Sequence, residues 1–278
     1  MTGDEVLRAA VDAARARWGA RLTAAYAIGS LGHGGFVPEV SDVDVAFVIT
    51  DPLASDDTAA AAEVTAVVAR SGSAPLASRL SVFWGSPASL RGAVAGGRFP
   101  AYDRLDLVQA GRLLWGTDVR ERVPAPKPRE LAIESASFAL MMLASPTMAG
   151  GQTVNPTALL RHPDPLVDRG SRDLTKLVLF PVRFLYTSRT GRSGQTYEAV
   201  ADFLDREVES PETKLVRAAH SWREHPFTDR DMALGLLREG LIPLYLRFID
   251  DYVARLRAVD EGSLVDRLLV WRDALTTR

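Results

Sequence analysis

The chain has 278 residues, enough for two domains of ordinary size, each with its own hydrophobic core. Its 33 basic and 35 acidic residues nearly balance, so it has no broad basic field of the kind that binds long nucleic acids. Cysteine is absent, which excludes disulfides, thiolate catalysis and zinc–thiolate sites. The four histidines are far apart in the sequence, without the spacing of metal ligands.

The first part of the chain predicts alternating helices and strands. Apolar positions at helical spacing among charges predict an amphipathic helix up to about Gly19, and not a signal peptide. A short strand, AAYAIGS, follows, then a glycine-rich loop and a second strand at 43–49. Residues 56–70 predict a helix, and RLSVFW at 79–84 predicts a third strand. We therefore expect a small mixed α/β domain.

A proline-rich segment, VPAPKPRE at 123–130, separates this part from the rest of the chain. Its prolines cannot continue a helix or a central strand, so we expect a first domain at 1–123 and a second domain at 124–278. Nearly every later segment has helical periodicity, which predicts a helical bundle. The expected fold class is α+β, with a small mixed-sheet domain followed by an all-helical domain.

We expect no membrane span in this sequence. The longest uncharged stretch, 135–160, is interrupted by prolines and glycines. A cytoplasmic protein is the resulting expectation.

The most informative stretch is AIGSLGHGGFVPEVSDVDVAFVIT at 27–50. Asp42 and Asp44 alternate with valines at the start of a strand, so their carboxylates are expected on one face. Gly29 allows a ligand to approach the backbone closely, and Ser30 offers a hydroxyl and an amide to an anionic oxygen. Mg²⁺ prefers carboxylate, phosphate and water oxygens, so the two halves predict a site for a magnesium-bound nucleoside triphosphate. The alternative is an ordinary loop followed by the polar start of a strand.

Residues 29–44 resemble the signature of the DNA polymerase β-like nucleotidyltransferase superfamily, in which Gly-Ser is followed by Asp-x-Asp. The wider pattern is similar to its aminoglycoside adenylyltransferase branch, of the streptomycin and spectinomycin type. Supporting segments are LDLVQAGRLLWGTD at 105–118 and VRFLYTSRTGRSGQTYEAVADFL at 182–204. The resemblance implies transfer of a nucleotidyl group, usually AMP from ATP, to a hydroxyl. It also implies that Asp42 and Asp44 hold Mg²⁺ and that Ser30 binds the outer phosphates.

The resemblance further implies a third carboxylate on the strand that follows the helix, where Ser81 stands instead. Glu130 and Glu134 are candidate substitutes because residues four apart share one face of a helix, and we take Glu134 as the candidate general base. Acids in the first turns of a helix are also favoured simply by its dipole. Asp103 and Asp106 are weaker candidates. Either another carboxylate supplies the base, or the chain binds nucleotide without transferring it.

The triphosphate tail requires positive charge, which the resemblance places in a lysine shortly after Thr-Gly. This sequence has Gln195–Tyr197 in that region. Arg189 and Arg192 flank Thr190-Gly191 and are candidates to replace the lysine, since guanidinium pairs well with phosphate. Basic residues near a helix C-terminus also complement the carbonyl groups there. Arg183, in an apolar helix, either makes a buried pair or reaches the ligand.

The acceptor is left open by the sequence. A polycationic aminoglycoside requires acids and aromatic residues, and Asp164, Asp168, Asp173 and Trp115 are candidates, but residues 161–176 contain no aromatic side chain. The expected partners are a nucleoside triphosphate and a small hydroxylated acceptor. The alternative is a catalytically silent nucleotide-binding protein of the same fold, which Ser81 favours. Action on RNA is disfavoured by the near-neutral charge.

Overall fold

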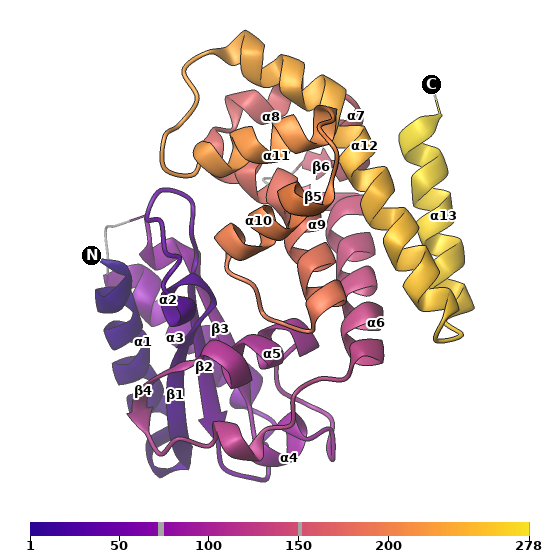
Figure 1. Ribbon diagram of the computed structural model, residues 1–278. Helices are drawn as coiled ribbons and strands as arrows, with labels where there is room; N and C mark the ends of the chain where they lie inside the picture. Colours follow the sequence, from indigo (N-terminus) through magenta and orange to yellow (C-terminus); the bar gives the residue numbers. More distant parts are fainter. Residues whose placement is uncertain (72–74, 150–151, 278) are drawn as a thin grey trace. The chain divides into compact units, whose positions relative to one another are not determined.

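The structure, a computed structural model, describes residues 1–71, 75–149 and 152–277. The chain divides into two compact units, Met1–Pro126 and Lys127–Arg278 (Figure 1). The first unit contains a four-stranded sheet with helices, and the described part of the second is helical apart from one short pair of strands. Within the described ranges, no helix combines the length and the apolar character needed to cross a membrane.

The sheet of the first unit has the strand order β3-β2-β1-β4. β1 pairs antiparallel with β2 and β4, whereas β2 pairs in parallel with β3. Their bounds are β1 Leu22–Ile28, β2 Val43–Ile49, β3 Leu80–Gly85 and β4 Arg112–Gly116. The first strand therefore ends at Ile28, and the next two residues of the predicted strand begin a short helix instead.

Helices cover both faces of this sheet (Figure 1). Their bounds are α1 Gly3–Trp18, α2 Gly29–His33, α3 Asp57–Ser71, α4 Pro87–Leu90 and α5 Ala101–Ala110, with 3-10 turns at Gly19–Arg21, Ala77–Arg79 and Arg120–Arg122. α1 and α3 pack on one face, in a core that includes Val45 and Phe47. α4 and α5 pack on the other face, in a core that includes Ala46 and Val48. Because alternate residues of a strand point to opposite faces, Asp44 lies on the α4–α5 side.

Asp57 anchors the helices on the face away from Asp44. Its carboxylate is 1% exposed and accepts hydrogen bonds from the Trp18 indole (3.0 Å) and from both terminal nitrogens of Arg21 (2.8 and 2.9 Å). Burial alone would raise the pKa of Asp57, but the hydrogen bonds from Arg21, the Ala54 amide and Trp18 lower it. This buried carboxylate thus ties α3 to α1 and to the turn before β1.

On the opposite face, Tyr26 ties the middle of β1 to the segment after β4. Its hydroxyl donates to Asp118 (3.0 Å) and accepts from the Val119 amide (2.7 Å). Burial raises the pKa of Tyr26 to about 12, while the Arg120 side chain holds the pKa of Asp118 well below its usual range. The network ties β1, the strand that ends just before Gly29, to the segment after β4.

The second unit is a helical bundle, as the sequence predicts. Its helices are α6 Pro128–Ala139, a π-helical turn Leu140–Ala144, α7 Pro156–Arg161, α8 Asp164–Asp168, α9 Ser171–Thr190, α10 Thr196–Arg206, α11 Pro211–Ser221, α12 Arg230–Arg257 and α13 Gly262–Thr276. β5 (Thr147–Ala149) and β6 (Gln152–Val154) form a short antiparallel pair that the sequence does not predict. Tyr245 and Tyr252 of α12 are buried and donate to carbonyl oxygens of α9, at Leu177 (2.9 Å) and Phe184 (3.2 Å). These bonds hold α9 against the long central helix.

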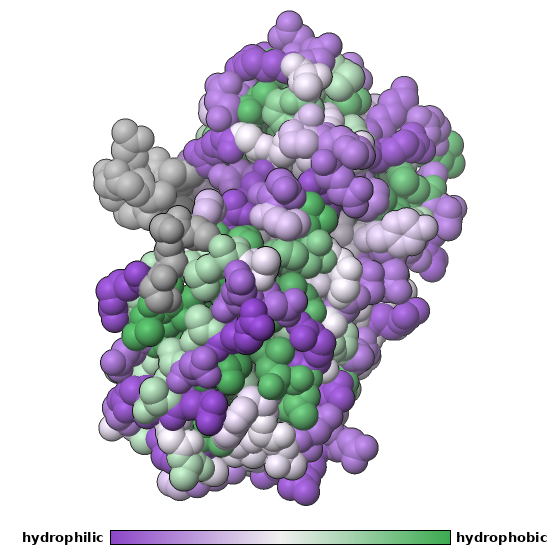
Figure 2. Space-filling view, turned by 90° about the vertical axis from the view of Figure 1, so that its left-hand side faces the viewer, coloured by the Kyte–Doolittle hydropathy of each residue, from purple (hydrophilic) through white to green (hydrophobic). Residues whose placement is uncertain are grey.

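The surface mixes hydrophobic and hydrophilic side chains, as Figure 2 shows for one face. One exposed apolar group lies at the end of α6 and in the π-helical turn: Phe138 is 40% exposed, Met141 55% and Met142 45%. Phe138 stacks on Phe180 of α9 with ring centroids 5.8 Å apart, so it belongs to the aromatic packing between α6 and α9.

Candidate functional site

The Gly29–Ser30 turn lies at the end of β1, directly beside Asp44. The antiparallel register pairs Ile28 with Asp44, so the residue after Ile28 meets that carboxylate. Gly29 has φ of 60°, a left-handed conformation that L side chains rarely adopt, and a Cβ added there would overlap the Asp44 carboxylate. Glycine is therefore required both for the backbone conformation and for the space that the carboxylate fills. The two halves of the sequence motif come together here.

Asp42 lies just before β2 and Asp44 is its second residue, and both are half-buried. The parallel register pairs Asp44 with Ser81 of β3, which is the position where the resemblance implies a third acid. Neighbouring residues in register point to the same face, so a hydroxyl stands next to Asp44 where a carboxylate was expected. In the parts of the chain that the structure describes, there is no group of three or more histidine, cysteine or acidic residues that could hold a metal ion.

Asp106 is the residue that sequence reasoning undervalued. It lies on α5, is 4% exposed, and accepts a hydrogen bond from the Gly29 amide through Oδ2. Its neighbours Leu105 and Leu107 are buried too, at 2% and 0% exposed. An acid between two buried leucines in LDLVQA was the available signal, because a carboxylate in such a segment must find a donor. Of the two weaker candidates, Asp106 contacts the turn.

The candidate general base lies in the second unit. Glu130 and Glu134 of α6 are half-buried and line one depression of about 260 Å³, together with Lys127, Arg129 and Ile133. The two carboxylates thus share a side of the helix, and cationic side chains lie on the same depression. The role of Glu134 as a base stays a prediction.

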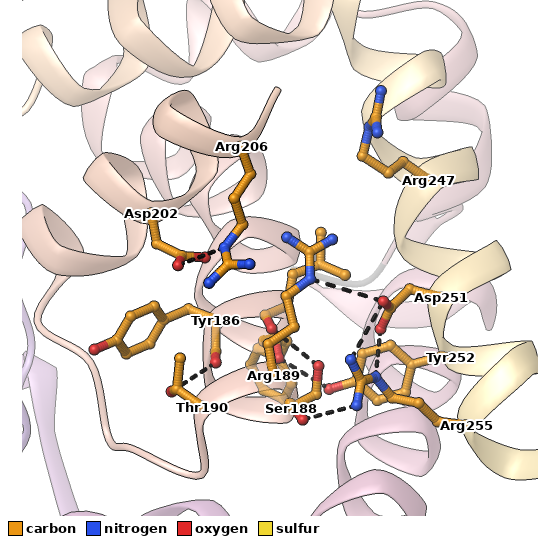
Figure 3. Close-up of polar contacts among 12 residues, drawn as sticks. Tyr186, Ser188, Arg189, Thr190, Asp202, Arg206, Arg247, Asp251, Tyr252 and Arg255 are labelled. Carbon is orange, nitrogen blue, oxygen red and sulfur yellow. Dashed lines mark hydrogen bonds and ion pairs between the residues drawn. The ribbon is translucent and has the colours of Figure 1, made fainter. Parts of the chain in front are cut away.

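Arg189 takes part in an ion-pair network on α9 and α12 (Figure 3). Its Nε lies 3.8 Å from Asp251 Oδ1, and its side chain is 20% exposed. Asp251 also binds Arg255 at 2.5 Å, and Arg255 Nη1 donates to the Ser188 carbonyl at 2.8 Å. A phosphate would therefore have to compete with Asp251 for Arg189.

Arg192 lies just after α9, where the Thr-Gly pair ends the helix. Thr190 Oγ1 donates to the Tyr186 carbonyl (2.8 Å) and accepts from the Arg192 amide (3.1 Å), and Gly191 has φ of 66°. The Arg192 side chain is 64% exposed, with Nη2 at 3.6 Å from Glu198 Oε1. This exposed pair is weak, so Arg192 is easier to redirect to a ligand than Arg189.

A second group of basic residues lies in this unit, and no local sequence pattern predicts it. Arg183 on α9, His220 on α11 and Arg223 just after α11 are all half-buried. Burial lowers the pKa of Arg223, and the nearby charge of Arg183 lowers it further. Burial and Arg223 likewise lower the pKa of His220. The nearby Glu224 carboxylate acts in the opposite sense and raises the pKa of both groups. The charges of Arg183 and Arg223 repel each other, whereas the lowered pKa of His220 favours its neutral form.

The candidate acceptor-binding acids are each paired with an arginine on the surface of the second unit. Asp164 pairs with Arg238 (2.7 Å) and Asp168 with Arg230 (3.1 Å). The third acid, Asp173, pairs with the adjacent arginine at 3.1 Å. In the first unit, the guanidinium carbon of Arg15 lies over the half-buried Trp115 ring, 5.4 Å from its centroid. These contacts leave the acceptor-binding role of all four residues a prediction.

Comparisons with known proteins bear on the fold. No protein-family model matches the chain, and no curated protein matches its sequence. The crystal structure of spectinomycin adenyltransferase AAD(9) from Enterococcus faecialis with ATP and spectinomycin is similar, with a TM-score of 0.55 over 84% of this chain and 97% of that chain. Because the sequence identity is 12%, this likeness establishes the fold and no more. It confirms the α+β class and an aminoglycoside adenylyltransferase-like fold.

Proposed function

We propose that the chain is a nucleotidyltransferase that moves a nucleoside monophosphate, usually AMP, from a magnesium-bound triphosphate to a hydroxyl of a small molecule. The observation that carries the proposal is the contact of Gly29 with Asp44, because it joins a Gly-Ser turn to a half-buried carboxylate where the two central strands of the sheet meet. The adenylyltransferase-like fold supports it.

Asp42 and Asp44 are the residues that fit Mg²⁺ in this proposal. They are hard oxygen ligands on adjacent alternate positions, and Mg²⁺ in nucleotide sites is usually held by one or two carboxylates together with phosphates and water. When bound, Mg²⁺ offsets charge on the triphosphate and polarises its phosphoryl oxygens. Ser30 donates its hydroxyl to an outer phosphate, next to the carboxylates.

The cations of the second unit take the remaining phosphate charge in this proposal. Arg192 exchanges its exposed pair with Glu198 for a phosphate, and Arg189 contributes by partial release from Asp251. The half-buried Arg183 and Arg223 are further candidates for this role, since a phosphate would relieve the repulsion between their charges.

Transfer itself requires a group that accepts the acceptor's proton. We assign this step to Glu134: as the acceptor oxygen forms a bond to the α-phosphorus, the bond to pyrophosphate breaks and the proton moves to the carboxylate. Glu130 is the alternative, because it lines the same depression. The acceptor class that the fold favours is a small hydroxylated molecule of aminoglycoside-like type, since spectinomycin is bound by the protein with the similar fold.

A second function is favoured by one observation. Ser81 stands in register beside Asp44, so the position next to the metal ligands lacks the acid that the resemblance implies. A nucleotide-binding protein that does not transfer would show this substitution, and would use ATP as a signal for a partner.

The two functions separate in one assay. The protein is incubated with Mg²⁺, labelled ATP and a panel of hydroxylated acceptors that includes aminoglycosides, and product and pyrophosphate are measured, with binding of MgATP measured in parallel. We expect acceptor-dependent pyrophosphate, and none with Asp44→Asn. Binding without pyrophosphate on any acceptor would favour the silent binder, and no binding of MgATP would contradict both.

A further inference from the structure

We propose that Asp106 is a positioning residue for the Gly29–Ser30 turn: its buried carboxylate holds the Gly29 amide and thereby keeps the turn seated against Asp44. The consequence for ATP rests on the proposed function. The positioning itself is a property of the free chain and can be tested without nucleotide.

The first argument is the hydrogen bond. Asp106 Oδ2 accepts from the Gly29 amide, although the two residues come from α5 and from the start of α2. The Asp106 side chain is 4% exposed, so its charge has lost most of its hydration and depends on donors from the protein. Charge-assisted hydrogen bonds to backbone amides are among the stronger ones. The backbone of Gly29 is therefore held at its nitrogen.

The second argument is what lies on the other side of Gly29. The direction in which a Cβ would point is filled by the Asp44 carboxylate, and the backbone has φ of 60°. Gly29 is thus enclosed by two acids, with Asp106 at its amide and Asp44 at its Cα. A rotation of this peptide would break the first contact and change the second. The backbone conformation of the turn and the position of the Asp44 carboxylate therefore both depend on Gly29.

The third argument is that α5 is fixed relative to α2 at a second point. A Cβ added at Gly32 would lie 2.9 Å from the Ala27 carbonyl oxygen and 3.2 Å from that of Ala110, the last residue of α5. Leu105 and Leu107 are buried on either side of Asp106 in sequence. The helix that carries Asp106 is therefore packed closely against the turn, so the position of the carboxylate is fixed.

The test combines two variants with a matched control. Asp106→Asn keeps the shape and an amide oxygen that accepts the same hydrogen bond, whereas Asp106→Ala removes the acceptor. Leu107→Val, at the adjacent position, loosens the packing of the same helix but keeps the carboxylate. In each ligand-free protein, exchange of the Gly29 amide hydrogen is measured by NMR, and the affinity for MgATP is measured by calorimetry.

We expect Asp106→Ala to speed exchange at Gly29 by about tenfold or more relative to amides in the middle of β1. The affinity for MgATP should fall about tenfold. Asp106→Asn should keep protection at Gly29 and bind MgATP at least as well as the unchanged protein, because it removes a negative charge near the phosphates. Leu107→Val should keep both. If Asp106→Ala does not fold, Asp106→Ser, which is too short to reach the amide, replaces it with the same expectation.

Unchanged exchange at Gly29 in Asp106→Ala or Asp106→Ser would overturn the proposal. So would tighter MgATP binding in both Asp106→Asn and the truncated variant, since Asp106 would then be competing with phosphate for the amide. Loss of MgATP binding in Asp106→Asn with normal Gly29 protection would make Asp106 a metal ligand instead. If the unchanged protein does not bind MgATP, the proposed function fails, and the exchange measurement still decides the positioning role.

Discussion

The Gly29 turn of the first unit and the arginine corner of the second, formed by Arg189 and Arg192, position their candidate residues in different ways. At the turn, strand register and the absence of a Cβ bring Gly29 against Asp44, so backbone geometry sets the contact. At the corner, Arg189 and Arg192 extend to acids nearby, Asp251 and Glu198. A contact that the backbone sets keeps its geometry when no ligand is bound. A long side chain instead pairs with a nearby acid when no ligand is bound. Substitutions should therefore be severe at the turn and mild at the corner.

The largest effect is expected for Glu134→Gln, which keeps the volume of the side chain but cannot accept a proton. Transfer should fall by about 10²- to 10⁴-fold, the usual loss of a general base, while MgATP binding is retained. Pyrophosphate release and calorimetry measure the two quantities. Glu239→Gln, an exposed position on α12, is the matched control. Full activity in Glu134→Gln together with loss in Glu130→Gln would move the role to Glu130.

Ser30→Ala should weaken ATP binding by about one to two decades, since a hydrogen bond to a charged group contributes roughly 1.5 to 3 kcal/mol. AMP, which lacks the outer phosphates, should lose less. Calorimetric titration with both nucleotides measures the difference. An equal loss for ATP and AMP would place Ser30 away from the outer phosphates.

Gly29→Ala and Gly34→Ala separate backbone strain from the contact with Asp44. Both glycines have positive φ, 60° and 88°, but a Cβ at Gly34 would meet nothing within 4 Å. Each substitution should lower the free energy of unfolding by about 1 to 3 kcal/mol. Only Gly29→Ala should weaken MgATP binding, by about tenfold, because only it displaces the Asp44 carboxylate. Denaturant unfolding and calorimetry measure both, and equal binding losses would show that strain alone matters.

The smallest effect is expected at the arginine corner. Arg192→Gln should weaken MgATP binding by about three- to fivefold, since an exposed charge contributes up to about 1 kcal/mol. Arg189→Gln should affect nucleotide binding less and stability more, because Arg189 is 20% exposed and pairs with Asp251. A hundredfold loss of MgATP affinity in either variant would show that the arginine corner contributes as much to phosphate binding as the turn does.

Strand patterns predicted the first unit well, because alternation between two buried faces leaves a clear signal. Residues 43–49 form β2 as expected, and the placement of Asp44 on one face follows from that alternation. α5 escaped prediction because LDLVQA has apolar residues at spacings that suit a strand as well as a helix. The bond from Gly29 to Asp106 joins segments distant in the sequence, and no local pattern encodes it.

The partners of the arginine side chains could not be predicted from the sequence. The sequence gives the residue type and the nearby Thr-Gly turn, which the structure places at the end of α9. The pairing of Arg189 with Asp251 depends on how α9 packs against α12, and the choice of partner by a long side chain is a tertiary property. The basic residues Arg183, His220 and Arg223 were not grouped from the sequence for the same reason, since they come from separate segments.

The most direct test of the account is calorimetry of Asp44→Asn with ATP in the presence and absence of Mg²⁺. The substitution removes one charge and keeps the shape that fills the space beside Gly29. Asp12→Asn, which removes the same charge from the exposed face of α1, is the control. We predict that Asp44→Asn stays folded and loses magnesium-dependent ATP binding, while Asp12→Asn keeps it. Unchanged magnesium-dependent affinity in Asp44→Asn would contradict the metal site on which the proposed function depends.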